Sequence, residues 1–161
     1  MAIAASMVPC FAINEDTSNQ ASEITITDMA GRSVTLMCPV ERIVMMDSSS
    51  VPELSAVYGE GFDSLIIGWD SALKDWSGDI YAKYVEKYPN MAEIQNVGSL
   101  DDNTFSPEKV TSLKPDVVIM PNWFLLFYGE ATKDALAKLE QADIPVVFDD
   151  FYINPLDNST K

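Results

Sequence analysis

Four apolar runs, each followed abruptly by polar residues, constrain the fold of this chain more than any other feature. The runs are RIVMM (42–46), SLIIGW (64–69), DVVIM (116–120) and IPVVF (144–148). Continuous apolar runs of this length are typical of strands covered on both faces, as in parallel sheets. A shorter strand is expected at 94–97, and helical patterns lie between most of the strands, at 50–58, 79–88, 107–113 and 130–142. This alternation predicts an α/β fold with a Rossmann-like, mainly parallel sheet flanked by helices.

The segment EITITDMAGRSVTL (23–36) predicts a β-hairpin at one edge of this sheet. Ile24 and Ile26 alternate with polar neighbours, residues 29–32 supply the turn, and the alternation then resumes. The 161 residues give room for one domain or one lobe of a larger protein. We therefore assign residues 23–150 to a single N-terminal α/β lobe that begins with this hairpin.

The first residues, MAIAASMVPCFAI, are small and apolar, and a polar stretch follows them. This pattern is similar to the end of a secretory signal peptide, so residues 1–22 are interpreted as a signal remnant or flexible tether of an exported, extracytoplasmic protein. Cys10 is a candidate for lipid attachment or for pairing with Cys38, but two unrelated thiols fit as well, because no CxxC motif is present. No run reaches the roughly 18 apolar residues of a membrane span, so no direct membrane insertion is expected.

The balance of charge argues against several classes of partner and chemistry. The chain has 25 acidic and 10 basic residues, a net charge of −15, and no histidine. Nucleic acid is not an expected partner, because binding phosphates requires a basic surface, and anionic lipid is disfavoured for the same reason. Without histidine there is no Ser-His-Asp triad and no imidazole-ligated zinc. No resident metal or cofactor is predicted, and the excess of acids fits solubility or a basic partner surface.

Three predicted helices begin with residues that favour a helix start. Ser50 stands three residues before Glu53, which is the spacing of a capping box. Ser106 is followed by proline, which is favoured at the first helical position, and Asp79 is expected to cap the helix that it begins. Ser50 is therefore interpreted mainly as a structural residue.

Polar and aromatic residues follow the apolar runs, at the edge where parallel sheets bind ligands. The candidates for a ligand-binding cleft are Asp47, Ser48, Ser49, Trp69, Asp70, Asp102, Asn122 and Trp123. Free hydroxyl groups at a helix start suit an oxygen-rich ligand, and large flat chelates are held mainly by apolar and aromatic surfaces. A plain polar turn explains residues 47–49 equally well. Packing of a tryptophan over the core at a strand end explains Trp69 and Trp123 equally well.

Two motifs resemble a known family. TDMAGRSVTLMCPVERIV (27–44) is similar to the opening of the substrate-binding proteins of ABC importers for ferric siderophores, haem and cobalamin, where a hairpin with Asp-x-x-Gly-Arg-x-Val and a proline precede an Arg-Ile-Val strand. GSLDDNTFSPEKVTSLKPDVVIM (98–120) is similar to a second segment of that family, which ends in Leu-Lys-Pro-Asp and an apolar strand. The matching residues are Asp28, Gly31, Arg32, Val34, Pro39, Arg42, Ile43 and Val44, then Gly98, Glu108, Val110, Leu113, Lys114, Pro115, Asp116, Val117, Val118 and Ile119.

The resemblance implies an extracytoplasmic solute-binding protein that delivers a ferric siderophore or similar metal chelate to an ABC importer, with cobalamin or haem as alternative ligands. Family members have two α/β lobes joined by a long helix, and the ligand lies between them. This chain resembles the first lobe only, so residues 151–161 are interpreted as the start of the interlobe linker, with the second lobe absent. Glu108 would then pair with arginines of the permease, although an acid at a helix start is also favoured by the helix dipole.

Two other functions stay open beside this non-enzymatic role. An enzyme on a doubly wound sheet could use Asp47, Asp70 and Asp149 as acids, but no GxGxxG motif, phosphate-binding loop or paired nucleophile and base is present. The other is a surface interaction module that kept the lobe without transporting anything.

Overall fold

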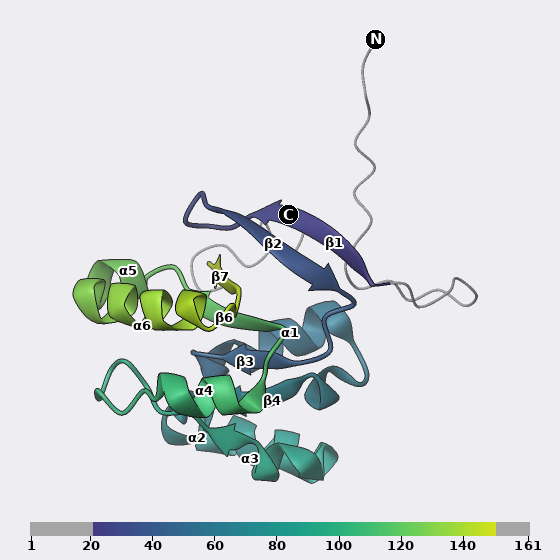
Figure 1. Cartoon of the computed structure of the whole chain (residues 1–161). Coiled ribbons are helices and arrows are strands. Elements are labelled where there is room, and N and C mark those ends of the chain that lie inside the picture. Colours follow the sequence, from purple (N-terminus) through teal and green to yellow (C-terminus); the bar gives the residue numbers. More distant parts are fainter. Residues whose placement is uncertain (1–20, 151–161) are drawn as a thin grey trace.

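Five short parallel strands form the central sheet, in the spatial order β5–β4–β3–β6–β7 (Figure 1). The computed structural model describes residues 21–150. The strands are β3 (Ile43–Met45), β4 (Ile66–Trp69), β5 (Gln95–Asn96), β6 (Val117–Pro121) and β7 (Val146–Asp149). All four neighbouring pairs run parallel. The predicted parallel α/β sheet is thus confirmed, with every predicted strand in its place.

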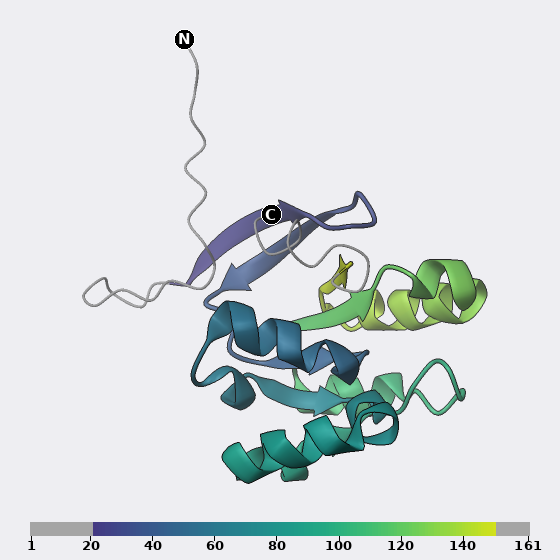
Figure 2. The ribbon, with the colours of Figure 1, turned by 180° about the vertical axis from the view of Figure 1, so that it is seen from behind.

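Helices cover both faces of this sheet: α4 lies in front of it in Figure 1, and α1 lies in front of it in the reverse view of Figure 2. The helices are α1 (Val51–Tyr58), α2 (Ala72–Trp76), α3 (Gly78–Lys87), α4 (Pro107–Leu113), α5 (Phe124–Phe127) and α6 (Gly129–Gln141), with short 3-10 turns η1 (Ser48–Ser50), η2 (Phe62–Ser64) and η3 (Pro89–Glu93). Alternate residues of β3 supply two hydrophobic clusters, Ile43 and Met45 to one and Val44 to the other. Because both faces of β3 are buried, its sequence is apolar throughout.

The helix starts were predicted with mixed success. Ser106 caps α4 as predicted, since its Oγ accepts a hydrogen bond from the backbone amide of Lys109 at 3.2 Å. The prediction that Asp79 is a cap is wrong, because α3 begins one residue earlier and Ser77 takes the N-cap position. Helices α2 and α5 were not predicted, because four or five residues are too few to show a helical repeat.

The hairpin is present but forms a two-stranded sheet of its own. β1 (Ser22–Thr27) and β2 (Ser33–Cys38) pair antiparallel and are not hydrogen-bonded as an edge of the main sheet. The hairpin turn, rather than a strand, contacts the main sheet, where the amide of Met29 donates to the carbonyl of Phe148 in β7 at 3.0 Å. The hairpin therefore lies at one edge of the main sheet as predicted, but it contacts the edge strand β7 through its turn and adds no strand to that sheet.

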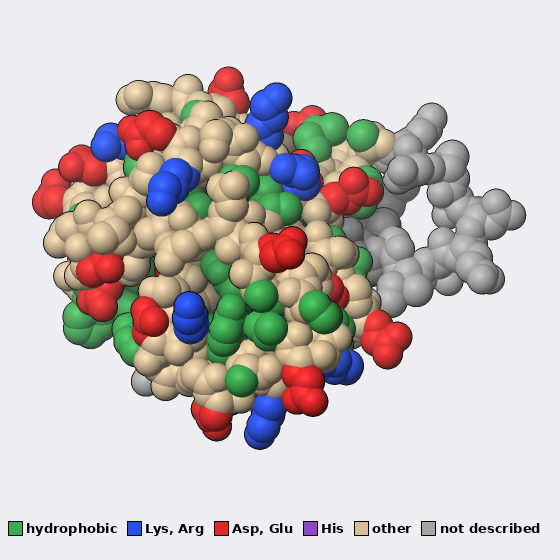
Figure 3. All heavy atoms as spheres, turned by 90° about the horizontal axis from the view of Figure 1, so that it is seen from below, with side chains coloured by type: hydrophobic (Ala, Val, Ile, Leu, Met, Phe, Trp, Pro, Cys, Tyr) green, Lys and Arg blue, Asp and Glu red, His purple; other side chains and the backbone are tan. Residues whose placement is uncertain are grey.

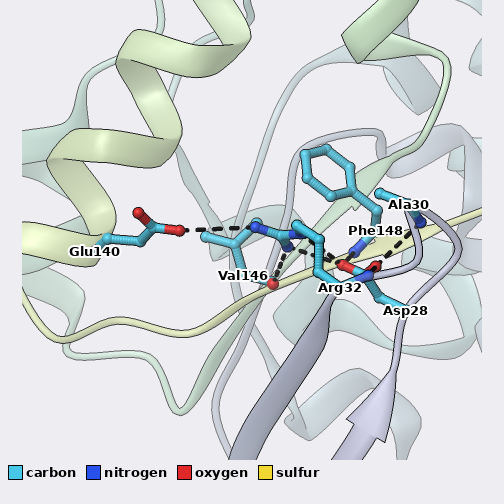
Figure 4. Close-up of polar contacts among 6 residues, drawn as sticks. All are labelled: Asp28, Ala30, Arg32, Glu140, Val146 and Phe148. Carbon is cyan, nitrogen blue, oxygen red and sulfur yellow. Dashed lines mark hydrogen bonds and ion pairs between the residues drawn. The ribbon is translucent and has the colours of Figure 1, made fainter.

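Asp28 organises that turn (Figure 4). Its side chain is fully buried, and one carboxylate oxygen accepts hydrogen bonds from the amides of Ala30 and Arg32 at 3.0 and 2.9 Å. The other oxygen accepts from Nε and Nη2 of Arg32 at 2.9 and 2.8 Å, and from the amide of Phe148 at 3.3 Å. A buried carboxylate surrounded by this many donors satisfies its own need for hydrogen bonds and ties the turn to β7.

Arg32 adds contacts on the β7 side of the same turn (Figure 4). Its Nη2 donates to the carbonyl of Val146 at 2.6 Å, and its guanidinium carbon lies 4.6 Å from the ring centroid of Phe148. Glu140 of α6 lies 3.7 Å from Nη1. The Asp and Arg of the hairpin motif therefore have a structural explanation. They hold the hairpin against β7, a strand that lies far from the hairpin in the sequence.

The surface on the side of α2 and α3 mixes apolar and charged side chains. Figure 3 shows this face from below, with hydrophobic side chains gathered near the middle and both acidic and basic ones around them. Trp76 of α2 and Ile80 of α3 are among the exposed large hydrophobic residues. Apolar atoms make up much of every protein surface, so exposed hydrophobic side chains bordered by charged ones are ordinary.

Candidate functional site

The order of the strands creates a single switch point in the described sheet, between β3 and β6. From β3 the chain proceeds through β4 to β5 on one side, and it then returns to the other side of β3 as β6 and β7. In such sheets the connections after the two central strands run apart, so the carboxyl ends at the switch point border a crevice where ligands bind. Asp47 and Ser48 follow β3 there, and Asn122 and Trp123 follow β6.

Asp47 begins the turn that follows β3. Its Oδ1 accepts a hydrogen bond from the amide of Ser49 at 3.0 Å and another from the hydroxyl of Ser49. Asp47 thereby caps η1. The sequence had instead suggested Ser50 as a cap, for the helix that follows η1. Ser50 does take the N-cap position of α1 but makes no side-chain capping bond, so the predicted capping box with Glu53 is wrong. The 3-10 turn places Ser50 in near-helical geometry, and the acid at the start of that turn caps instead.

Ser48 and Asp70 join the ends of β3 and β4. The amide and the hydroxyl of Ser48 both donate to Oδ1 of Asp70, at 2.8 and 2.6 Å. The Ser48 oxygen in turn accepts from the amide of Leu73 at 2.9 Å, and Asp70 Oδ1 accepts from the amide of Ala72 at 3.2 Å. Both residues are buried, at 1% and 5% exposure. Ser48 thus has a structural role, and its predicted contact with ligand stays a prediction.

The buried carboxyl group of Asp70 has an unusual affinity for its proton. Burial raises the pKa of Asp70 to about 6, against the hydrogen bonds from Ser48 that lower it, and the charge of Asp47 raises it further. Neighbouring Trp69 is 6% exposed and packs against Tyr81 with ring centroids 6.2 Å apart. Most of Trp69 therefore belongs to the core, as one of its two interpretations from sequence had it.

The aromatic residues after β6 form a cluster. Trp123 is partly buried and lies edge-on to Phe124 and Phe127, with ring centroids 4.6 and 5.9 Å away. Phe124 is buried in the core, whereas Leu126 and Phe127 are 80% and 75% exposed. The backbone amide of Asn122 donates to the carbonyl of Asp149 at 2.7 Å, which fixes the end of β6 beside the end of β7. The cluster thus places aromatic and apolar side chains directly after the end of β6.

Acidic residues from three other places converge on the same edge. Burial raises the pKa of Asp149, at the end of β7, to about 8, and the charges of Asp47, Asp150 and Glu53 raise it further. Glu53 Oε2 and Asp150 Oδ1 are buried and have no hydrogen-bond partner in the described part of the chain. From sequence, Asp149 was interpreted as the polar end of a strand and as a candidate acid of an enzyme, but it was not included among the cleft residues. Its position directly after the fourth apolar run was the signal that placed it at the same edge as Asp47.

The loop between β5 and α4 holds two further acids. Asp102 accepts hydrogen bonds from the amide and the hydroxyl of Thr104 at 3.0 and 2.6 Å, and the hydroxyl bond lowers its pKa. Asp102 therefore closes its own turn at the surface. Tyr128 donates to Asp101 at 2.7 Å, and burial together with this bond raises the pKa of Tyr128 to about 12. The second contact joins the loop to the junction of α5 and α6.

Glu108 lies exposed in the first turn of α4. A hydrogen bond from its own backbone amide, and a second from the hydroxyl of Ser106 at 3.2 Å, lower its pKa. The side chain is thus a charged, accessible group at the start of a helix. This geometry fits both interpretations from sequence, helix stabilisation and docking on a partner.

Within residues 21–150, no three or more Cys, Asp or Glu side chains are grouped so that they could hold a metal ion. No helix among these residues is long and apolar enough to span a membrane. Cys10, a candidate for lipid attachment or for pairing with Cys38, lies outside the described residues. The site is an edge of carboxyl, hydroxyl and aromatic groups suited to binding.

Comparisons with known proteins agree with this geometry. No protein-family model matches the chain, and no curated protein matches its sequence. The crystal structure of the TroA-like periplasmic binding protein FepB from Veillonella parvula is 33% identical, with a TM-score of 0.73. The molybdate periplasmic binding protein MolA of Haemophilus influenzae is 23% identical with a TM-score of 0.61, and the petrobactin-binding protein YclQ of Bacillus subtilis is 18% identical with a TM-score of 0.52.

The matches cover most of this chain but a minor part of each neighbour. They include 84%, 80% and 79% of this chain, and 39%, 35% and 37% of the neighbours in the same order. The chain thus spans less than two fifths of the length of these proteins. Its described fold is that of one lobe of TroA-like periplasmic binding proteins, which agrees with the resemblance found in the sequence.

Proposed function

We propose that this chain supplies one wall of the binding cleft of an extracytoplasmic solute-binding protein that delivers a ferric siderophore or similar metal chelate to an ABC importer. The observation that carries the proposal is the switch point between β3 and β6, where candidate cleft residues from both strands meet in a fold shared with periplasmic binding proteins. An enzyme is not favoured, since the neighbours named above are all binding proteins.

The chemistry of the edge supports a chelate over a free oxyanion such as molybdate. The charges of Asp47, Asp150 and Glu53 all act on Asp149 there, and a small anion would meet repulsion from the same three charges. Trp123 and its aromatic neighbours instead offer flat apolar surface, which suits a bulky chelate whose charge is spread over many atoms. Cobalamin and haem share that bulk and are the alternatives that the experiment must separate.

A thermal-shift titration of the chain with ferric siderophores, haem and cobalamin tests the proposal. A ligand at 100 times its Kd should stabilise the fold by about 2.7 kcal/mol. Trp123→Ala should weaken binding at least tenfold, because it removes the partly buried aromatic face at the switch point. Trp76→Ala is the matched control, since that tryptophan is 64% exposed on α2. Absence of a shift with all three ligand classes, or equal losses in both variants, would contradict the proposal.

The proposed docking of this chain on an ABC permease has its own test. Glu108→Ala should leave ligand affinity unchanged while lowering uptake through the complete importer, because an exposed acid is positioned to pair with basic residues of a permease. Glu86→Ala, which removes another exposed acid on α3, should change neither quantity. A loss of ligand affinity in Glu108→Ala would place this residue in the cleft instead.

A further inference from the structure

A partly enclosed cavity of about 120 Å³ lies at the carboxyl end of β4, beside the switch point. Residues from the ends of β3 and β4 and from α2, α3 and η3 surround it, among them Ser48, Trp69, Asp70, Lys74, Tyr81 and Met91. Its volume is a little smaller than the roughly 150 Å³ cavity that is known to bind benzene. The cavity therefore accommodates a group of about five or six heavy atoms, a part of a chelate and not a whole one.

Asp70 is the charged group that is buried at this cavity. Every hydrogen bond to its carboxyl group from the described residues goes to Oδ1, which leaves Oδ2 available as an acceptor. None of the ion pairs among the described residues includes Asp70. Burying a carboxylate without a counter-charge is costly, and a cation that enters the cavity would remove that cost.

The other walls of the cavity suit a cation as well. Trp69 and Tyr81 both line it, with ring centroids 6.2 Å apart and planes inclined by 54°. Aromatic faces attract ammonium groups through the negative charge of the ring face, and the attraction is strongest where water is excluded. Asp47 adds a second negative charge close enough to act on Asp70.

Lys74 is the cationic side chain at the cavity, and it does not neutralise Asp70. It belongs to the exposed part of α2 and forms no ion pair with a described residue. Tyr81 contributes its aromatic ring and a phenol group to the lining. The buried groups of the lining are consequently acidic and aromatic, and its one cationic side chain is exposed.

We propose that this cavity is a subsite for a protonated primary amine on the ligand, with Asp70 as its counter-charge and Trp69 and Tyr81 as aromatic walls. The subsite deepens the proposed function and rests on it: it selects chelates that carry a free alkylammonium arm over those that do not. Ser48 has an indirect part, because its two bonds hold Oδ1 of Asp70 and thereby fix the orientation of Oδ2.

A fragment titration followed by two-dimensional NMR tests the subsite by itself. n-Butylammonium should shift the indole N–H signal of Trp69 in a saturable way, with the signals of Trp76 and Trp123 unmoved. n-Butanol and butyrate of the same length should bind about tenfold more weakly or not at all, as expected for loss of a charge-assisted hydrogen bond. Equal binding of n-butanol, or stronger binding of butyrate, would overturn the proposal, the latter by showing that Lys74 controls the site.

Two variants separate recognition from folding. Asp70→Asn keeps an acceptor for the bonds from Ser48 and Ala72 but removes the charge, so it should weaken n-butylammonium binding about tenfold or more while the NMR spectrum stays that of a folded chain. Tyr81→Leu removes an aromatic wall from a partly exposed position and should also weaken binding. Asp79→Asn, an exposed acid on α3 outside the cavity, is the control. Wild-type affinity in both Asp70→Asn and Tyr81→Leu would refute the subsite.

A pair of matched chelates distinguishes failure of the subsite from failure of the proposed function. Ferrioxamine B carries a terminal alkylammonium arm, and its N-acetylated form lacks the charge. The amine form should bind the chain at least about tenfold more tightly. Equal affinity for both would refute the subsite and leave the proposed function standing. Binding of n-butylammonium at Asp70 with no binding of either chelate would support the subsite and count against trihydroxamate chelates as ligands.

Discussion

Removing the guanidinium group of Arg32 should destabilise the chain far more than removal of an ordinary surface charge. Arg32→Met keeps the aliphatic stem but deletes two bonds to Asp28 Oδ2, at 2.9 and 2.8 Å, the bond to the Val146 carbonyl at 2.6 Å and the contact with the Phe148 ring. The Asp28 side chain has no exposed surface, so its charge is left buried without a counter-charge.

The expected cost follows from that burial. Breaking a buried ion pair by removing one partner costs about 3–5 kcal/mol. Because the Arg32 side chain is 29% exposed and three backbone amides still reach Asp28, we expect a value near the lower end, about 3 kcal/mol. With a urea dependence of about 1.5 kcal/mol per molar, the unfolding midpoint should fall by about 2 M.

Urea unfolding followed by circular dichroism measures this change. Adding Asp28→Asn to Arg32→Met removes the stranded charge, so the double variant should lose less stability than the two single variants combined, with a coupling of about 0.5–3 kcal/mol. Lys133→Met is the matched control, because Lys133 pairs with Glu130 at 2.7 Å on an exposed helix face and its loss should leave the midpoint unchanged. A loss below about 1 kcal/mol in Arg32→Met, or strict additivity in the double variant, would refute the view that a buried pair holds the hairpin on β7.

Three further predictions concern the carboxyl edge. The folded-state pKa values of Asp149 and Asp70 are raised to about 8 and about 6, so the folded chain holds these protons more tightly than the unfolded one, and stability should fall as pH rises from about 4 to 8. Asp149→Asn should flatten that fall in a series of melting temperatures, and an unchanged slope would count against a buried acid there. Ser48→Ala should cost about 1–3 kcal/mol in urea unfolding, because it leaves Asp70 and a backbone amide short of partners; no loss would mean that water replaces the hydroxyl. Gly98→Ala should lower the melting temperature by several degrees, since a Cβ there would lie 2.1 Å from the carbonyl oxygen of Thr104 at a backbone φ of +83°; a variant as stable as wild type would contradict the described turn.

The residues that defined strands and the hairpin could be predicted because their signals are local. Alternation at Ile24 and Ile26 and the unbroken apolar run at 42–46 each report how a strand is covered. The cap of α1 was mispredicted for the opposite reason. Ser50 and Glu53 have the spacing of a capping box, but a 3-10 turn with Asp47 as its own cap intervenes, and nothing in the local pattern distinguishes the two arrangements.

The sequence by itself determined the class of fold, the hairpin and the polar residues at the strand ends. These features follow from the local pattern of apolar and polar residues, which reports how each strand or helix is buried. It did not determine the order of the strands. Only the tertiary structure placed β6 and β7 on the far side of β3, which brings Asp149 near Asp47 and forms the switch point between residues far apart in sequence. The cavity at Asp70 was likewise decided by the tertiary structure, since residues from the ends of β3 and β4 and from α2 and α3 line it. Contacts between distant segments depend on how whole elements pack, and that packing is a property of the assembled core.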